Sequence, residues 1–265
     1  MNHRLSRAER RQILKDDEPW VGKPLAIGAI DRALQANTRH LALMLRDTRQ
    51  RHRASQAAAF ALQLLDMTLS AQIKQPAACA KGCSHCCRTL ITATVPEILR
   101  LARAIKSEKE VVKRVLDAAA RSKGIPQSAP NSTRVVCPIL EESLCSQYAV
   151  RPMVCRSLLS GSLAACVWIF EEDAPEAIPF VPPSADIRAY VLLMLQAALR
   201  LAGLPYQHYE LSKGLAAALT QDDAEARWLA GAPVFTGVEI DQADTRPSRV
   251  SAMAEQLAAA IQPSL

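Results

Sequence analysis

The most informative segment of the chain is Cys79-Ala-Lys-Gly-Cys83-Ser-His-Cys86-Cys87, which gathers four cysteines within nine residues. The other four cysteines follow it, and none lies elsewhere in the 265 residues: Cys137, Cys145, Cys155 and Cys166. Cysteines that serve only packing are scattered, whereas metal-binding cysteines gather because their sulfur atoms must converge on one ion. The pattern therefore predicts a thiolate metal site.

The N-terminal residues and the apolar stretches indicate the cellular compartment that we expect. The N-terminal residues are charged and include no apolar segment, so they do not form a secretory signal. The longest apolar stretch, 189–204, is too short to span a bilayer and is interrupted by Gln196 and Arg200. We predict a cytoplasmic protein without a membrane partner. Thiols stay reduced in that compartment, which favours metal or redox chemistry over a disulfide framework.

Composition favours a mainly α fold. Alanine is abundant, and the chain has only nine glycines and few aromatic residues. We expect an irregular helical domain around a cysteine-rich loop region. We expect its parts to be an N-terminal helical region (1–75), a cysteine-cluster domain with C-terminal helices (76–235), and a linker with a terminal helix (236–265).

Periodicity and capping signals place the helices. Ser6 with Glu9, and Ser107 with Glu110, have the spacing of capping boxes. Residues 89–94 are rich in Thr and predict a short strand. Helices are predicted from Arg7 onward, over 25–74, and over 94–105, 107–124, 187–202, 208–220, 221–230 and 249–261. The basic residues in 46–53 interrupt the apolar pattern of 25–74; we interpret them as a solvated helix face, with a bend between two helices as the alternative.

The spacing of the cysteines suits zinc or an iron–sulfur cluster, each of which needs about four protein ligands. Gly82 precedes Cys83 and permits the backbone turn that brings neighbouring sulfur atoms together. Eight cysteines supply either two mononuclear sites or one site with surplus thiols, and the sequence leaves both open.

Basic residues beside the cysteines are candidate partners of the sulfur atoms. Four thiolates around Zn²⁺ leave a net charge of about −2, which needs surrounding donors when it is desolvated. Arg151 and Arg156 are candidates for this supporting role, with Arg88 as a further one; an ordinary surface position is the alternative for each. His85 is either a nitrogen ligand or an exposed loop residue. Tyr148 is expected to pack, with its hydroxyl hydrogen-bonded.

The cysteine segments resemble the YkgJ-like cysteine-cluster family of zinc- or iron-chelating domains. That family has a CxxCxxCC run, then CPxL, then CxxYxxRPxxCR. Here the matching segments are 79–87, Cys137-Pro-Ile-Leu, and Cys145-Ser-Gln-Tyr-Ala-Val-Arg-Pro-Met-Val-Cys155-Arg156, although the first gap has three residues instead of two. The resemblance implies metal binding by six of the cysteines: Cys83, Cys86, Cys87, Cys137, Cys145 and Cys155. Cys166 lies outside the tight signature.

We therefore predict a metal-binding protein that chelates zinc or iron. The main alternative is a metal-dependent enzyme, because a relative of this family, the flagellin lysine N-methylase, has a similar cysteine pattern. The spacing Cys79-x3-Cys83-x2-Cys86 also occurs in radical S-adenosylmethionine enzymes. Those enzymes need a strand–helix barrel that the mostly helical sequence after residue 87 does not predict.

A nucleic-acid-binding zinc module is the least favoured alternative. The net charge is +6, and the basic residues are spread along the chain. Trp20, Trp168 and Trp228 are far apart, so no basic stripe with interleaved aromatic residues is present in the sequence.

Overall fold

The computed structural model describes residues 6–126, 129–174, 176–240 and 249–262. Helices dominate these residues, as predicted. The helices are α1 (Arg7–Asp17), α2 (Ile30–Arg46), α3 (Arg53–Gln72), α4 (Val95–Ile105), α5 (Lys109–Arg121), α6 (Met153–Ser157), α7 (Leu163–Glu171), α8 (Ser184–Leu201), α9 (Leu211–Leu219), α10 (Ala224–Leu229) and α12 (Arg249–Ile261).

Local sequence signals account for several boundaries. The predicted capping box at the start of α1 is formed, because the Ser6 amide donates to Glu9 and the Glu9 amide donates to the Ser6 hydroxyl. The basic segment 46–53 separates α2 from α3, so the favoured interpretation of these residues as a solvated helix face was wrong and the alternative, a bend between two helices, is confirmed. Arg46 donates to the Leu201 carbonyl (2.7 Å) and Arg53 donates to the Leu45 carbonyl (2.8 Å), so both arginines brace the bend.

Two further local predictions were wrong. The Ser107–Glu110 capping box does not form, because Ser107 belongs to the tight α4–α5 turn and α5 has Glu108 as its N-cap residue. Residues 208–210 are not helical but form strand β4 (His208–Glu210), since β1 (Thr92–Thr94) offers them an antiparallel partner. A second hairpin pairs β2 (Leu140–Glu141) with β3 (Leu144–Cys145).

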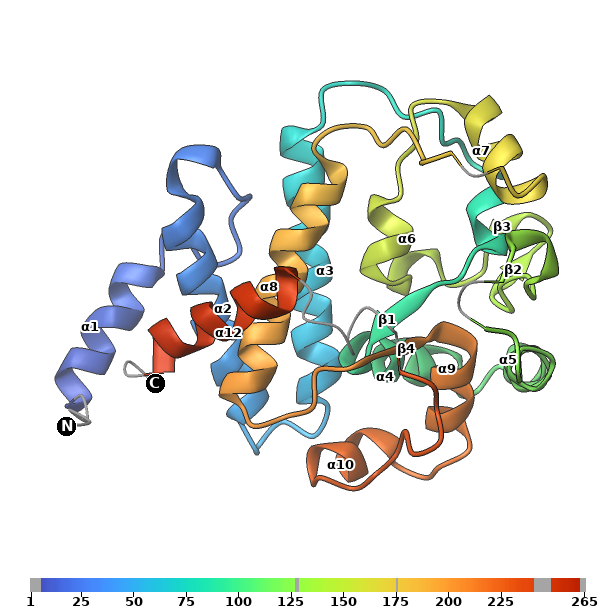
Figure 1. Ribbon diagram of the computed structural model, residues 1–265. Helices are drawn as coiled ribbons and strands as arrows, with labels where there is room; N and C mark the ends of the chain where they lie inside the picture. The colour runs from blue at the N-terminus through green and yellow to red at the C-terminus, as the bar shows by residue number, and fades with distance from the viewer. Residues whose placement is uncertain (1–5, 127–128, 175, 241–248, 263–265) are drawn as a thin grey trace.

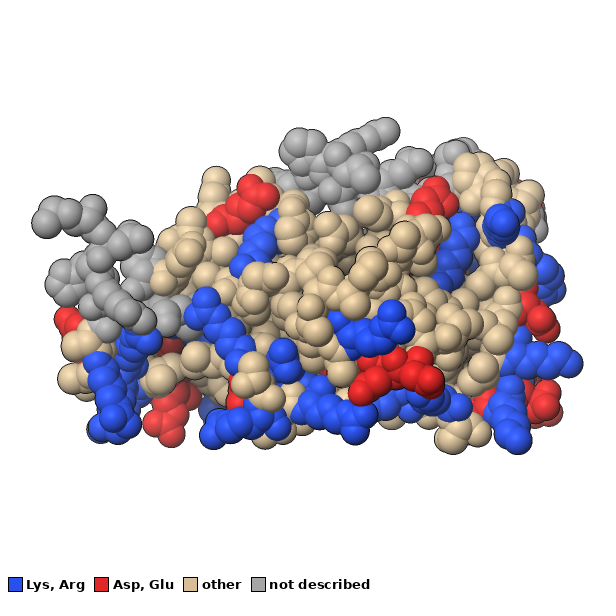
Figure 2. Space-filling view, turned by 90° about the horizontal axis from the view of Figure 1, so that it is seen from below, with Lys and Arg blue, Asp and Glu red and all other residues tan. Residues whose placement is uncertain are grey.

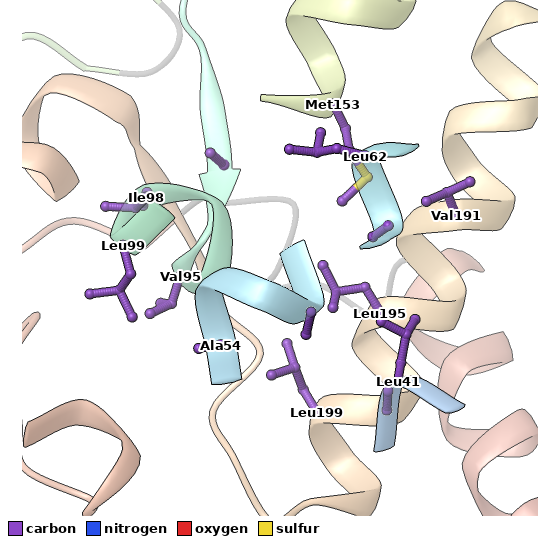
Figure 3. Packing of buried hydrophobic residues seen from close by; sticks show 14 of the residues in the cluster. Leu41, Ala54, Leu62, Val95, Ile98, Leu99, Met153, Val191, Leu195 and Leu199 are labelled. Carbon is purple, nitrogen blue, oxygen red and sulfur yellow. The ribbon is translucent and has the colours of Figure 1, made fainter. Parts of the chain in front are cut away.

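The core lies between the long helices. α3 and α8 stand side by side, with α2 and α12 on one side and α4 on the other (Figure 1). Figure 3 shows Leu41 of α2, Ile98 of α4 and Leu195 of α8 within this core, and all three side chains are fully buried. Each such burial contributes about 1.5–3 kcal/mol. The same apolar cluster extends from Leu25 to Ile261, so α2 and the C-terminal helix α12 pack on α8 and belong to the same core.

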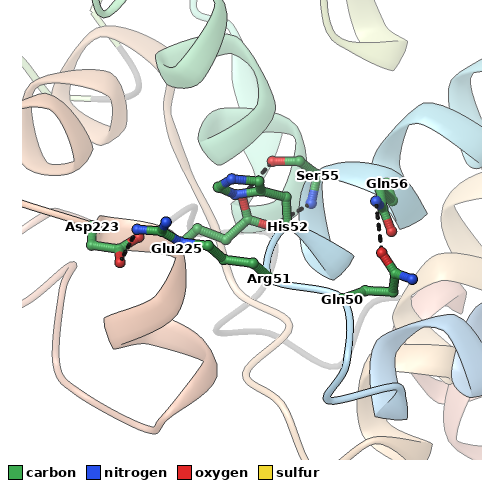
Figure 4. A network of polar contacts seen from close by, with 7 residues as sticks. All are labelled: Gln50, Arg51, His52, Ser55, Gln56, Asp223 and Glu225. Atoms are coloured by element: carbon green, nitrogen blue, oxygen red, sulfur yellow. Dashed lines mark hydrogen bonds and ion pairs between the residues drawn. The ribbon is translucent and has the colours of Figure 1, made fainter.

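A buried carboxylate ties α10 to the start of α3 (Figure 4). Glu225 is 6% exposed and accepts hydrogen bonds from the backbone amide and the hydroxyl of Ser55. His52 lies 3.3 Å from the same carboxylate, and Arg51 pairs with Asp223 at 2.7 Å. These contacts connect two segments about 170 residues apart in the sequence, near the bend braced by the basic residues.

Charged residues are mixed on the face shown in Figure 2, where Lys and Arg side chains are interspersed with Asp and Glu. None of the helices in the described ranges has both the length and the apolar character needed to cross a bilayer.

Candidate metal centre

The cysteine segments meet at one end of the molecule, away from α1 and α12 (Figure 1). The first run ends in a short 3-10 helix, η2 (His85–Arg88), which packs against α7. The backbone amide of Cys137 donates to the Cys87 carbonyl at 2.9 Å and so joins the second cysteine segment to the first. All eight cysteines are free thiols.

The first loop turns at Gly82, as predicted. Its φ is +88°, a conformation that favours glycine, and the amide of Cys83 donates to the Ala80 carbonyl at 3.0 Å. His85 does not simply point into solvent, because its Nδ1 lies 2.8 Å from a carboxylate oxygen of Glu171 in α7. This contact, together with η2 packing on α7, brings the first run beside the helix that carries Cys166.

A two-residue turn positions Cys145. In the β2–β3 hairpin, Leu140 faces Cys145 and Glu141 faces Leu144, so Glu142 and Ser143 form the turn. Both turn residues have positive φ, 46° and 62°, as a type I′ turn requires. Asn-Gly is the preferred sequence there, so this turn holds Cys145 at a conformational cost.

Cys155 is placed by α6, and α6 is held at its N-terminus by a residue of α4. The Glu97 carboxylate is 4% exposed and accepts hydrogen bonds from the amide of Met153 (2.7 Å) and from the amide and hydroxyl of Thr94. A carboxylate at the N-termini of two helices is favourable because the unpaired amides and the helix dipoles both attract negative charge. The T-x-x-E pattern in the sequence predicts only the local cap of α4, and the bond to α6 becomes visible only in the fold.

The two arginines predicted to support the sulfur atoms have different surroundings. Arg156 is buried and fully engaged: it pairs with Asp66 of α3 and donates to the carbonyls of Ala149 (2.6 Å) and Arg151 (2.9 Å). It therefore fixes the loop between the hairpin and α6. Arg88, by contrast, is exposed.

Arg151 has buried nitrogen atoms without a hydrogen-bond partner. Its Nε and one terminal nitrogen, Nη1, are in this state, and its guanidinium carbon lies 3.4 Å from the centre of the Tyr148 ring. Tyr148 is 65% exposed, so it covers this cation instead of packing into the core. The Arg151 charge lies close enough to the thiols of Cys86 and Cys145 to favour their ionised forms.

The adjacent thiols of Cys86 and Cys87 interact directly. A hydrogen bond between them lowers the pKa of Cys86 to about 7 and raises the pKa of Cys87. The positive charge of Arg151 further favours the Cys86 thiolate. The pair therefore retains one proton more tightly than the other.

Burial opposes ionisation at the other thiols. It raises the pKa of Cys137 to about 11 and also raises those of Cys79, Cys145 and Cys155. Neighbouring thiols add to this effect, because several thiolates close together repel one another. A bound cation offsets the repulsion between thiolates and so favours deprotonation of the thiols, which bind metals in their deprotonated form.

The cysteine sulfur atoms are the type of ligand that binds zinc or iron. Soft thiols gathered from distant segments suit zinc or iron, and the unpartnered guanidinium nitrogens of Arg151 are donors suited to a negatively charged metal–thiolate group. Within the described ranges, no three Cys, His, Asp or Glu side chains stand in an arrangement that holds a metal ion. Metal binding therefore requires the thiols to draw closer than they stand here.

Comparison with known proteins agrees with a role of these cysteines in metal binding. Residues 78–169 match the sequence profile of the CxxCxxCC family, described as a "Putative zinc- or iron-chelating domain". The matched segment contains all eight cysteines, so this part of the chain is similar to that family, in agreement with the resemblance of its motifs. No curated protein and no solved structure shows significant similarity to the chain.

Proposed function

We propose that this protein binds zinc or iron through the thiolates of its cysteine-cluster domain, in tetrathiolate or iron–sulfur form. The candidate ligands are the eight cysteines: Cys79, Cys83, Cys86, Cys87, Cys137, Cys145, Cys155 and Cys166. Arg151 is the proposed charge partner of the bound thiolates, and Arg156 holds the loop that presents them.

The observation that carries this proposal is Arg151, whose Nε and Nη1 are buried without a hydrogen-bond partner and whose charge favours the thiolates of Cys86 and Cys145. Buried guanidinium nitrogens without hydrogen-bond partners are costly, and thiols that ionise beside them compensate for that cost. Thiolates in turn repel each other unless a metal ion neutralises them. A bound metal ion would therefore allow several thiolates to gather beside Arg151 without repelling one another.

A structural role for the metal follows from the local architecture. The cysteines lie mostly in loops, a 3-10 helix, a two-residue strand and a five-residue helix, none of which is stable alone. Metal–thiolate bonds between such segments substitute for an apolar core. We therefore propose that the metal stabilises this end of the molecule.

The test is the metal content of protein purified without oxygen. Elemental analysis and the absorbance spectrum separate colourless zinc protein from iron–sulfur protein with its broad visible absorbance. Cys145→Ser should lower both metal content and thermal stability, because binding and folding are linked. Val154→Ala is the matched control, since Val154 is half-buried beside Cys155 but has no ligand atom. Wild-type protein that contains neither zinc nor iron would refute the proposal.

A further inference from the structure

A cleft lies between α1 and α2, at the end of the molecule opposite the cysteine segments (Figure 1). Its volume is about 440 Å³, and its walls are mostly apolar, with Leu14 of α1, Val21 of the segment after α1 and Ala36 of α2 among the lining residues. Pockets of about 300–1,000 Å³ with mostly apolar walls are typical small-molecule sites. The cleft therefore has the size and the lining of a small-molecule site.

The cleft exists because α1 packs sparsely on the rest of the protein. Within α1 only Asp17 is buried, and Arg39 of α2 donates to both of its carboxylate oxygens, at 2.6 and 3.2 Å. Leu14, one turn earlier, is 45% exposed. The ion pair thus holds the C-terminal end of α1 against α2 and leaves the apolar surface beside it accessible to a ligand.

The basic residues of the cleft are not neutralised by acids. Arg11 and Lys15 line it from successive turns of α1, and neither exposed side chain has an ion-pair partner among the described residues. Two acids also line the cleft, but Asp17 is paired with Arg39, which leaves Glu18. The cleft therefore has a net positive charge, which favours an anion over a cation.

His40 adds a polar group to the wall that α2 forms. Its ring packs on that of Phe60, with 4.8 Å between the ring centres, and no group in the described ranges forms a hydrogen bond with either ring nitrogen. Burial lowers the pKa of His40, so its ring is neutral at pH 7 and offers one N–H donor. A partly buried donor without a partner suits a ligand that brings an acceptor.

We propose that this cleft binds a small amphiphilic carboxylate. Its apolar chain lies against Leu14 and Val21, and its carboxylate accepts hydrogen bonds from Arg11, Lys15 and His40. A small polar anion lacks the apolar chain that the walls accommodate, and an amphiphilic cation is repelled by the two basic residues of α1. The proposal does not depend on the metal centre, which lies at the other end of the molecule (Figure 1).

Isothermal titration calorimetry of the full-length chain with decanoate, below its micelle concentration, tests the proposal. Decanoate should bind at about one site per chain. Decylammonium, which has the opposite charge, and acetate, which has almost no apolar chain, should each bind about tenfold more weakly or not at all. Absence of decanoate binding would overturn the proposal, and so would equal binding of decanoate and decylammonium, because the site would then recognise the apolar chain alone.

A double variant on α1 tests the cations. Arg11→Gln combined with Lys15→Gln should weaken decanoate binding about tenfold or more, because charge-assisted hydrogen bonds to the carboxylate are lost. Lys109→Gln combined with Lys113→Gln is the matched control, since these are two exposed cations at the same spacing on α5. Undiminished affinity in the α1 variant, or an equal loss in both double variants, would refute the role of Arg11 and Lys15.

Nuclear magnetic resonance of the wild type gives a second measurement, which does not depend on how a variant folds. Decanoate should shift the ring resonances of His40, which His40→Phe identifies among those of the five histidines. The same variant keeps an aromatic ring beside Phe60 but removes the donor, and should bind decanoate about 3–10-fold more weakly. Unshifted His40 resonances at saturating decanoate would place the ligand outside the cleft and contradict the proposal.

Discussion

The carboxylate of Glu97 accepts a 2.7 Å hydrogen bond from the backbone amide of Met153, 56 residues further along the chain. Glu97 belongs to the first turn of α4, and Met153 opens α6, which carries Cys155. The packed helical frame is thereby joined to the irregular cysteine region through one buried carboxylate.

Glu97→Gln should lower the free energy of unfolding by about 1–3 kcal/mol, because the buried amides lose an ionised acceptor and an NH₂ group faces a donor. Urea denaturation measures the change. Glu110→Gln is the control, since Glu110 is exposed in the first turn of α5. Equal small effects for both variants would show that the Glu97–Met153 bond contributes little.

The β2–β3 turn offers a stabilising change. Replacing Glu142-Ser143 by Asn-Gly should raise the free energy of unfolding by about 1 kcal/mol, because left-handed backbone is unfavourable for Glu and Ser. Thermal unfolding measures this. Glu172→Asn removes one exposed negative charge at negative φ and should leave stability nearly unchanged. A destabilised Asn-Gly variant would mean that the turn is not type I′.

Gly214 of α9 permits close contact with α4. A Cβ at this position would lie 2.7 Å from Cδ1 of the fully buried Ile98. Gly214→Ala should therefore destabilise the protein by about 1–2 kcal/mol through overpacking, despite the better helix propensity of alanine.

Ile98→Val removes the clashing Cδ1 and alone costs about 0.5–1.5 kcal/mol. The double variant should lose less stability than the sum of the single variants, which a double-mutant cycle in urea would measure. Strict additivity would contradict close contact between these two positions.

Arg151→Gln tests the proposed charge partner. Metal affinity should fall about 10–100-fold, the range for groups that support ligands, while the number of ions bound at saturation stays the same. The metal-stripped protein should not be destabilised, because the removed guanidinium has unpartnered buried atoms. Competition with a chromophoric chelator measures the affinity, with the exposed Arg88→Gln as control. Unchanged affinity in Arg151→Gln would exclude this role.

His40 should make the protein sensitive to acid. Burial lowers its pKa, and its ring lies 4.8 Å from that of Phe60. The unfolded chain therefore binds the proton more readily, so the contribution of His40 to stability is present above the unfolded pKa of about 6.5 and is lost as the pH falls below it. His40→Gln should flatten the pH dependence of unfolding there, as measured by urea denaturation from pH 5 to 8. If the free energy of unfolding of His40→Gln depends on pH as steeply as that of the wild type, His40 does not have this role.

Much of the helical architecture follows from local signals. The Ser6–Glu9 box marks the start of α1, and the terminal helix occupies the predicted 249–261. The failure at 208–210 has a non-local cause, since those residues are extended only because β1 lies beside them. The predicted division at residues 75 and 235 stays a prediction.

The amino-acid sequence by itself determined the helical class and the resemblance of the cysteine segment to a metal-chelating family, because side-chain periodicity, capping residues and cysteine spacing are properties of neighbours along the chain. Only the tertiary structure decided that Glu97 holds α6 and that Arg151 rather than Arg156 has buried nitrogens without hydrogen-bond partners. Those relationships join residues far apart in the sequence, and their partners are chosen by the packing of helices, which no local pattern records.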